Sequence, residues 1–176
     1  QVAQVRGLDG VELNYPALVD EDNVDAVRRA LAETGLAVSN VSLNVWGASQ
    51  WGMGSLSSPD PAVRAAAVET MVRGMRVARA VGSPLVSLWP GQDGFDYPFQ
   101  VDYGAAVDWF IDGLRQAAAS DPGMRICLEY KQKEPRAHLL LDNAARTMWL
   151  IGKVGAPNVG VLLDVGHALC AYESPA

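Results

Sequence analysis

The chain has 176 residues, a formal net charge of −6, 49 % hydrophobic residues and 19 % charged residues. This is an ordinary globular composition, which excludes a disordered, collagenous or coiled-coil chain. The acidic balance and the lack of any Lys/Arg run argue against nucleic acid or an anionic membrane as partner. Apolar stretches such as residues 159–165 are much shorter than a membrane span, so we expect a cytoplasmic protein without membrane contact.

Short apolar runs alternate with amphipathic segments along the whole chain, which is the pattern of repeated strand–helix units. The runs that predict strands are residues 10–15, 36–46, 85–89, 125–131 and 159–165. Four helices are expected between them, each opening at a capping residue and closing near a glycine. The expected openings are the acidic run 20–22, Ser58 with Pro59 at the first helical position, Asp102, and Asp142 or Asn143. No Gly/Ser-rich linker interrupts this order, so residues 1–176 are interpreted as a single domain.

Repeated βα units form either a doubly wound sheet or a (β/α)₈ barrel. The first strand lacks a Gly-rich dinucleotide fingerprint, which weakens the first alternative. Polar residues gather at the carboxyl ends of all five strands, which is where a barrel carries its active site. We therefore predict an α/β fold, a partial (β/α)₈ TIM barrel of about five βα units. It would span barrel strands 2 to 6 and lack the first strand and the last two, so we expect the chain to be a fragment of a longer protein.

Four residues at the last two strand ends could carry chemistry. Glu129 and Lys131 lie two apart on one strand and so face the same way, while Asp164 ends the next strand and His167 follows in the loop above it. Carboxylate and imidazole ligands suit Mg²⁺, Mn²⁺ or Co²⁺, and a lysine beside them suits a substrate oxygen that gains negative charge. The alternative is purely structural: a buried Glu–Lys ion pair and an aspartate that caps a helix.

The other candidate residues are aromatic or sulfur-bearing. Trp46, Trp51 and Trp89 lie at or just past strand ends, where indoles could form the wall of a sugar site, although core packing is the commoner use of tryptophan. Cys127 and Cys170 are the only cysteines and are predicted to be buried, reduced thiols.

Four segments in this order resemble the xylose isomerase superfamily. Residues 44–56 with 58–64 are similar to its third-strand loop and following helix, and residues 88–94 to its Trp-Gly-Gly-Arg-Glu-Gly turn. Residues 128–131 and 163–167 resemble its Glu-x-Lys and Glu/Asp-x-x-His metal motifs. Because aspartate replaces the usual glutamate in the last motif, the chain looks closest to the L-rhamnose isomerase and sugar isomerase members.

The resemblance implies a divalent-metal-dependent aldose–ketose sugar isomerase that works by a 1,2-hydride shift. Glu129 and Asp164 would match ligands of one metal, and His167 a ligand of the second; Mn²⁺ is expected, with Mg²⁺ or Co²⁺ as alternatives. Lys131 and Glu129 would be catalytic. Lys131 and His167 would also contact the substrate.

The resemblance further implies that Trp51 and Trp89 wall a monosaccharide site and that the enzyme is a homodimer or homotetramer. The remaining ligands of the family would lie beyond Ala176, so the 176-residue chain alone is expected to be inactive. Two alternatives stay open: a sugar 3-epimerase or endonuclease-type member of the same superfamily, and a non-catalytic truncated barrel module.

Overall fold

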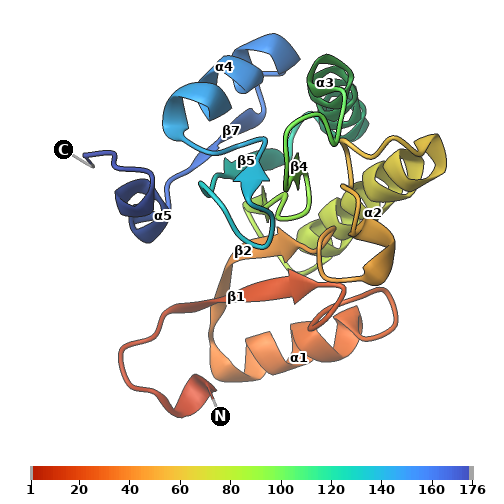
Figure 1. Cartoon of the computed structure of the whole chain (residues 1–176). Helices are drawn as coiled ribbons and strands as arrows, with labels where there is room; N and C mark the ends of the chain where they lie inside the picture. The colour runs from red at the N-terminus through yellow and green to blue at the C-terminus, as the bar shows by residue number, and fades with distance from the viewer. Residues whose placement is uncertain (1, 175–176) are drawn as a thin grey trace.

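The centre of the computed structural model, which describes residues 2–174, is a parallel five-stranded sheet with the order β1-β2-β3-β5-β7 (Figure 1). Its strands are β1 (Gly10–Tyr15), β2 (Ala37–Leu43), β3 (Leu85–Leu88), β5 (Arg125–Glu129) and β7 (Val159–Leu162). From β2 onward, each of these five strands pairs in parallel with the strand of the same sheet that comes before it along the chain. This order confirms the number and order of the predicted strands and is that of a barrel wall, since a doubly wound sheet reverses its direction. The strands β5 and β7 end earlier than predicted, so Lys131 and Asp164 lie beyond them rather than on them.

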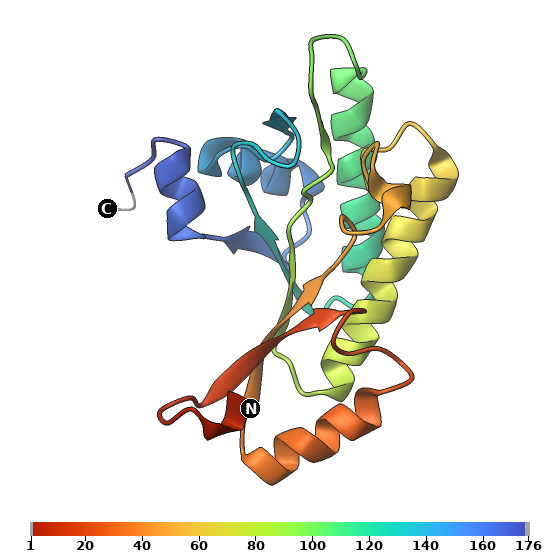
Figure 2. The same cartoon turned by 60° about the horizontal axis from the view of Figure 1, so that its bottom comes forward.

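Five α-helices connect and follow these strands. They are α1 (Val24–Thr34), α2 (Pro61–Ala80), α3 (Tyr103–Ser120), α4 (Ala144–Val154) and α5 (Val165–Cys170). Figure 2 shows α1, α2 and α3 along the same side of the curved sheet. Two short 3₁₀ turns, η1 (Val2–Gln4) and η2 (Ser49–Trp51), complete the helical elements of the described residues. None of the helices in the described part of the chain has the length and apolar character needed to cross a bilayer.

The helix-facing side of the sheet carries the hydrophobic core. Tyr15 and Leu43 from neighbouring strands are almost fully buried there, as are Leu88 and Leu128. Helix α2 approaches the sheet closely at Gly74, because a Cβ atom at that position would overlap the side chains of Tyr15 and Leu43. The opposite side of the sheet is left to polar residues, as side-chain alternation in the strands requires.

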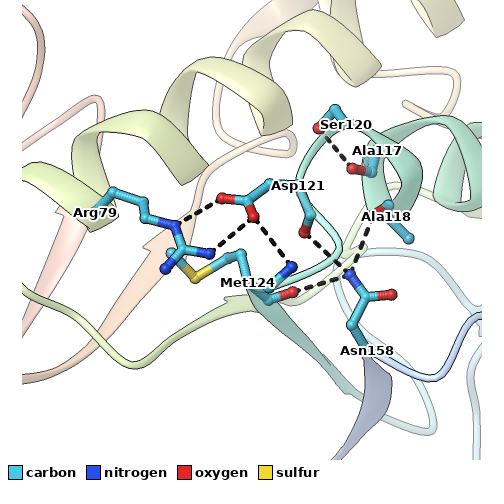
Figure 3. A network of polar contacts seen from close by, with 8 residues as sticks. Arg79, Ala117, Ala118, Ser120, Asp121, Met124 and Asn158 are labelled. Carbon is cyan, nitrogen blue, oxygen red and sulfur yellow. Dashed lines mark hydrogen bonds and ion pairs between the residues drawn. The ribbon is translucent and has the colours of Figure 1, made fainter.

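The ends of the sheet that are remote from the polar residues are fixed by a hydrogen-bond network (Figure 3). The amide nitrogen of Asn158, just before β7, donates to the carbonyl oxygens of Ala118, Asp121 and Met124 at 3.1, 3.2 and 3.0 Å. Arg79 at the end of α2 donates to both carboxylate oxygens of Asp121 at 2.7 and 2.8 Å. The network joins α2, the α3–β5 turn and β7.

Three local predictions need correction. Helix α2 begins at Pro61 rather than Pro59, because the Asp60 side chain accepts the N–H of Ala62 at 2.8 Å and so forms the N-cap. His167 lies in helix α5 rather than in a loop. Cys170 is exposed on this helix, whereas Cys127 is half-buried in β5.

A two-stranded antiparallel ribbon was not predicted. It pairs β4 (Gly94–Phe95), in the loop after β3, with β6 (His138–Leu139), in the loop after β5. The two strands have two residues each, which is too short to give an alternating hydrophobic pattern in the sequence. The ribbon links two loops at the carboxyl ends of the main strands and so stabilises the region around the predicted site.

Candidate active site

The carboxyl ends of β5 and β7 bring three predicted ligands together. Glu129 is the last residue of β5, and Asp164 follows β7 as the N-cap of α5. The Asp164 carboxylate accepts the backbone N–H of His167 at 2.8 Å, which is the usual hydrogen bond of an N-cap residue. This cap starts the helix, and the helix carries the imidazole of His167 back toward β5.

Glu129, Asp164 and His167 each offer a ligand atom, and these atoms all lie within 4.8 Å of one another. Nδ1 of His167 is 3.2 Å from Oε1 of Glu129 and 3.9 Å from Oδ2 of Asp164. Donors bound to one octahedral cation at about 2.1 Å lie ~3–4 Å apart, so the three side chains lie close enough to hold a divalent ion once the imidazole turns to present Nε2. Two carboxylates and an imidazole form a donor set that suits Mn²⁺, Mg²⁺ or Co²⁺.

The His167 ring is oriented by the backbone of the residue after Glu129. Nδ1 lies 3.0 Å from the carbonyl oxygen of Tyr130. A carbonyl oxygen only accepts hydrogen bonds, so this contact assigns the ring hydrogen to Nδ1 and leaves the lone pair of the neutral imidazole on Nε2. A backbone carbonyl in this role is the common way to orient a metal-binding histidine.

The surroundings of Glu129 disfavour the ionised form of its carboxyl group. Burial raises the pKa of the Glu129 carboxyl above its usual value, and the negative charges of Asp164 and Glu12 raise it further. His167 and Lys131 act in the opposite direction but do not compensate. A cation placed between the carboxylates would reverse this balance, so the electrostatics of the site favour positive charge at this point.

Lys131 lies over Trp89, and its charge acts on Glu129. The Lys131 Nζ is 5.5 Å from the Trp89 ring centroid and 3.4 Å from Oε2 of Glu134. The structural alternative of a Glu129–Lys131 ion pair is therefore replaced by a pair with Glu134. The other half of that alternative, a capping aspartate, is observed for Asp164, which serves as cap and candidate ligand together.

Two of the three candidate tryptophans contact each other in the structure. Trp89 contacts Trp46 edge-to-face, with ring centroids 4.8 Å apart. Trp51 is only 3 % exposed and belongs to the hydrophobic core, so it offers little surface to a substrate. The substrate contacts predicted for Trp51 and Trp89 stay predictions.

A buried aspartate that sequence reasoning did not assign to the site holds the loops around it. Asp93 is 1 % exposed, and its carboxylate accepts the backbone N–H and the hydroxyl of both Ser55 and Ser57. Burial raises the pKa of the Asp93 carboxyl, and the serine hydrogen bonds partly oppose that rise. The contact ties the loop after β2 to the loop after β3. The available signal for it in the sequence was an acidic residue within the Gly-rich segment 91–94.

Arg136 joins the loop after β5 to the same assembly. Its side chain is 9 % exposed, donates to the carbonyl oxygen of Gly52 at 2.8 Å, and lies 3.4 Å from Oδ2 of Asp96. In the sequence it stands in a charged stretch that resembles a solvated surface, so no local signal marks it.

Hydrogen-bonded polar side chains also connect the three strands β1, β2 and β3. Nδ2 of Asn40 donates to Oε2 of Glu12 at 3.0 Å and to Oγ of Ser87 at 2.7 Å. Asn40 is 6 % exposed, and its Oδ1 has no hydrogen-bond partner among the described residues. Its place two residues before Ser42 on the same strand face could have identified it from the alternation alone.

With this geometry established, the chain can be compared with known proteins. The sequence pattern of the family described as "Xylose isomerase-like TIM barrel" matches residues 1–176. The chain belongs to this family. Among curated relatives of this xylose isomerase-like chain, a "Probable sugar isomerase" of Rhizobium meliloti (strain 1021) is 31 % identical over 121 residues, which is 68 % of this chain and 28 % of the relative. The xylose isomerase of Thermus thermophilus is 29 % identical over 134 residues, 74 % of this chain and 35 % of that protein.

Solved structures confirm the barrel architecture of the family. D-psicose 3-epimerase from Clostridium cellulolyticum H10 superimposes with a TM-score of 0.73 at 20 % identity, over 96 % of this chain and 57 % of that one. The 3-keto-D-glucoside 4-epimerase YcjR from E. coli gives 0.74 at 20 % identity, over 93 % and 60 %. The xylose isomerase-like chain thus spans about a third of these curated relatives and somewhat over half of these structures.

Proposed function

We propose that this chain carries half of the active site of a divalent-metal-dependent sugar isomerase that interconverts an aldose and a ketose. The observation that carries the proposal is the convergence of Glu129, Asp164 and His167 within 4.8 Å, with the charge of Lys131 acting on Glu129. The sugar isomerases among its relatives support the same reaction class. Mn²⁺ is the proposed ion.

In this reaction the hydrogen on C2 moves with its electron pair to C1. The C2 hydroxyl loses a proton and the C1 oxygen gains one, so no redox partner is consumed. A divalent cation bound by Glu129, Asp164 and His167 would polarise the two substrate oxygens. Lys131, whose Nζ lies over Trp89, would donate a hydrogen bond to the oxygen that gains negative charge. Trp89 and Trp46 would exclude water from the transferring hydrogen.

A sugar 3-epimerase is the second candidate, and the similar structures named as epimerases favour it. That reaction removes a proton from a carbon next to the carbonyl group and returns it to the opposite face. Glu129 would serve as one base, and its raised pKa suits a group that must carry a proton during the cycle. The charge of Lys131, which acts on Glu129, favours the hydride shift.

Isotope transfer distinguishes the two reactions in the full-length, Mn²⁺-loaded protein. With aldoses that carry deuterium at C2, a hydride shift keeps the label and moves it to C1 of the ketose. Epimerisation of a ketose in D₂O instead introduces solvent deuterium at C3. We expect label retention at C1 by NMR. Deuterium incorporation at C3 without aldose formation would overturn the isomerase assignment and establish the epimerase.

Lys131 provides the residue-level test. Lys131→Met should lower kcat by about 100-fold or more, the scale of losing an electrostatic donor at a reacting oxygen. Lys133→Met is the matched control, because Lys133 is exposed two residues further along the chain. Equal activity of the two variants would contradict the proposed role of Lys131.

A further inference from the structure

Tyr130 is held at both ends by parts of the chain that follow β7. It is 1 % exposed, and its backbone carbonyl oxygen contacts Nδ1 of His167 at 3.0 Å. At the other end of the residue, the phenol donates a hydrogen bond of 2.6 Å to Oε2 of Glu173. One residue next to Glu129 therefore contacts both the α5 imidazole and the segment that leaves α5.

Glu173 connects three elements through its two carboxylate oxygens and its backbone. Oε2 binds the Tyr130 phenol after β5, and Oε1 accepts the backbone N–H of Ala144 at 2.8 Å, at the first residue of α4. The Glu173 N–H donates to the carbonyl oxygen of Ala168 in α5 at 3.0 Å. The end of α5 is thereby fixed to the ends of β5 and to the start of α4.

The backbone bends sharply to make this connection. Tyr172 has a φ of 59°, in the left-handed region, and its side chain is 91 % exposed. A residue with a Cβ atom rarely adopts this conformation. The turn directly precedes Glu173, whose side chain reaches Tyr130.

We propose that Glu173 is a positioning residue for the candidate metal site, which it acts on through Tyr130 and α5. By fixing α5 against β5, it sets the separation of Asp164 and His167 from Glu129 and keeps the His167 Nδ1–H on the Tyr130 carbonyl. The inference rests on the proposed function for the role of the three ligands. Loss of an outer partner of a metal ligand typically weakens metal affinity about 10–100-fold.

The test uses three variants in the full-length protein. Glu173→Ala removes both carboxylate contacts, Tyr130→Phe removes only the phenol contact, and Glu173→Gln keeps an acceptor for Ala144 and a polar partner for Tyr130. Glu33→Ala is the matched control, since it removes the same charge from an exposed position on α1. Thermal unfolding of each variant identifies any that fail to fold, and Tyr130→Phe and Glu173→Gln are conservative enough to remain usable.

The first readout needs no metal. The ¹⁵N shifts of the His167 ring report which nitrogen carries the hydrogen, and His138, the other histidine of these 176 residues, is an internal reference. We expect an Nδ1–H tautomer in the parent protein and in Glu173→Gln. We expect a mixture of tautomers in Glu173→Ala and Tyr130→Phe, with His138 unchanged. Parent-like ring shifts in both of those variants would overturn the inference.

The second readout is Mn²⁺ affinity by electron paramagnetic resonance. We expect about tenfold weaker binding in Glu173→Ala, at the lower end of the range for outer partners, and rescue to within about threefold in Glu173→Gln. Equal losses in Glu173→Ala and Glu33→Ala would contradict the positioning role. If the parent protein binds no Mn²⁺ while the ring shifts respond as expected, the metal function fails and the positioning of His167 stands.

Discussion

The imidazole Nδ1 of His167 lies 3.2 Å from a carboxylate oxygen of Glu129, although one residue is on α5 and the other ends β5. Asp164 adds a second carboxylate at 3.9 Å from the same nitrogen. Burial and these neighbouring carboxylates make the ionised form of Glu129 unfavourable in the metal-free chain. Residues arranged for binding commonly reduce stability in this way.

Glu129→Gln should therefore stabilise the metal-free protein at pH 7 by about 1 kcal/mol. The raised pKa means that the folded state holds the Glu129 proton more tightly than the unfolded state. The unfolding free energy of the parent protein thus falls as the pH rises from the unfolded pKa through the folded one. Urea unfolding in EDTA at pH 4 and pH 7 checks this, because the advantage of Glu129→Gln should be larger at pH 7. An equal or larger gain at pH 4 would contradict the assignment.

Two substitutions of Asp93 separate the contribution of its hydrogen bonds to stability from the contribution of its charge. Asp93→Ala leaves the buried N–H groups of Ser55 and Ser57 without an acceptor and should destabilise the protein by about 3 kcal/mol. Asp93→Asn keeps the oxygen that accepts both N–H groups and should lower stability by less than about 1 kcal/mol. Because burial raises the pKa of Asp93, the parent should lose stability relative to Asp93→Asn as the pH rises through that pKa. Chemical unfolding at several pH values measures both effects.

The contacts of Asn158 predict which of two substitutions lowers the stability of the protein more. Its amide group donates to three carbonyl oxygens (Figure 3). Asn158→Ala removes the donors and should lower stability by about 1–3 kcal/mol. Asn158→Asp should be worse, because it directs a negative charge at the same three carbonyl oxygens. Thermal unfolding at pH 7 gives the order; a more stable aspartate variant would show that the three contacts are unimportant.

Because one edge of β7 is unpaired among the described strands, we expect the 176-residue chain to self-associate when it is expressed alone. Among the described strands β7 pairs only with β5, and Val161, Leu163 and Val165 are 38, 52 and 53 % exposed. Unpaired strands without charged residues or proline are templates for pairing. Light scattering should find oligomers, and Val161→Lys should reduce them. Val5→Lys is the control, since Val5 is exposed outside the sheet. A monomer before substitution would refute the prediction.

The strand pattern and the three candidate ligands could be predicted from the sequence, because both follow from local periodicity and from residue types at strand ends. Glu129, Asp164 and His167 were identified in this way and do converge. The contacts that orient them could not be predicted. Glu173 reaches Tyr130 across 43 positions of the chain, and its role depends on a backbone turn that its neighbours do not encode as a motif.

The packing of the loop tryptophans could not be predicted from the sequence for a related reason. Trp46 and Trp51 stand in the same Gly-rich loop, and periodicity does not reach into a loop. The structure buries Trp51 in the core and places Trp46 against Trp89, contacts that depend on tertiary packing rather than on the local sequence.

The agreement of strand order with chain order has a consequence for how the protein is made. Each strand that leaves the ribosome finds its sheet neighbour already synthesised, so the wall can grow in one direction without waiting for a later segment. Asp164 follows Glu129 by 35 residues, which takes roughly 2–7 s at the usual rate of translation of about 5–20 residues per second. Asp164 and His167 therefore join Glu129 only after β7 has been added to the wall.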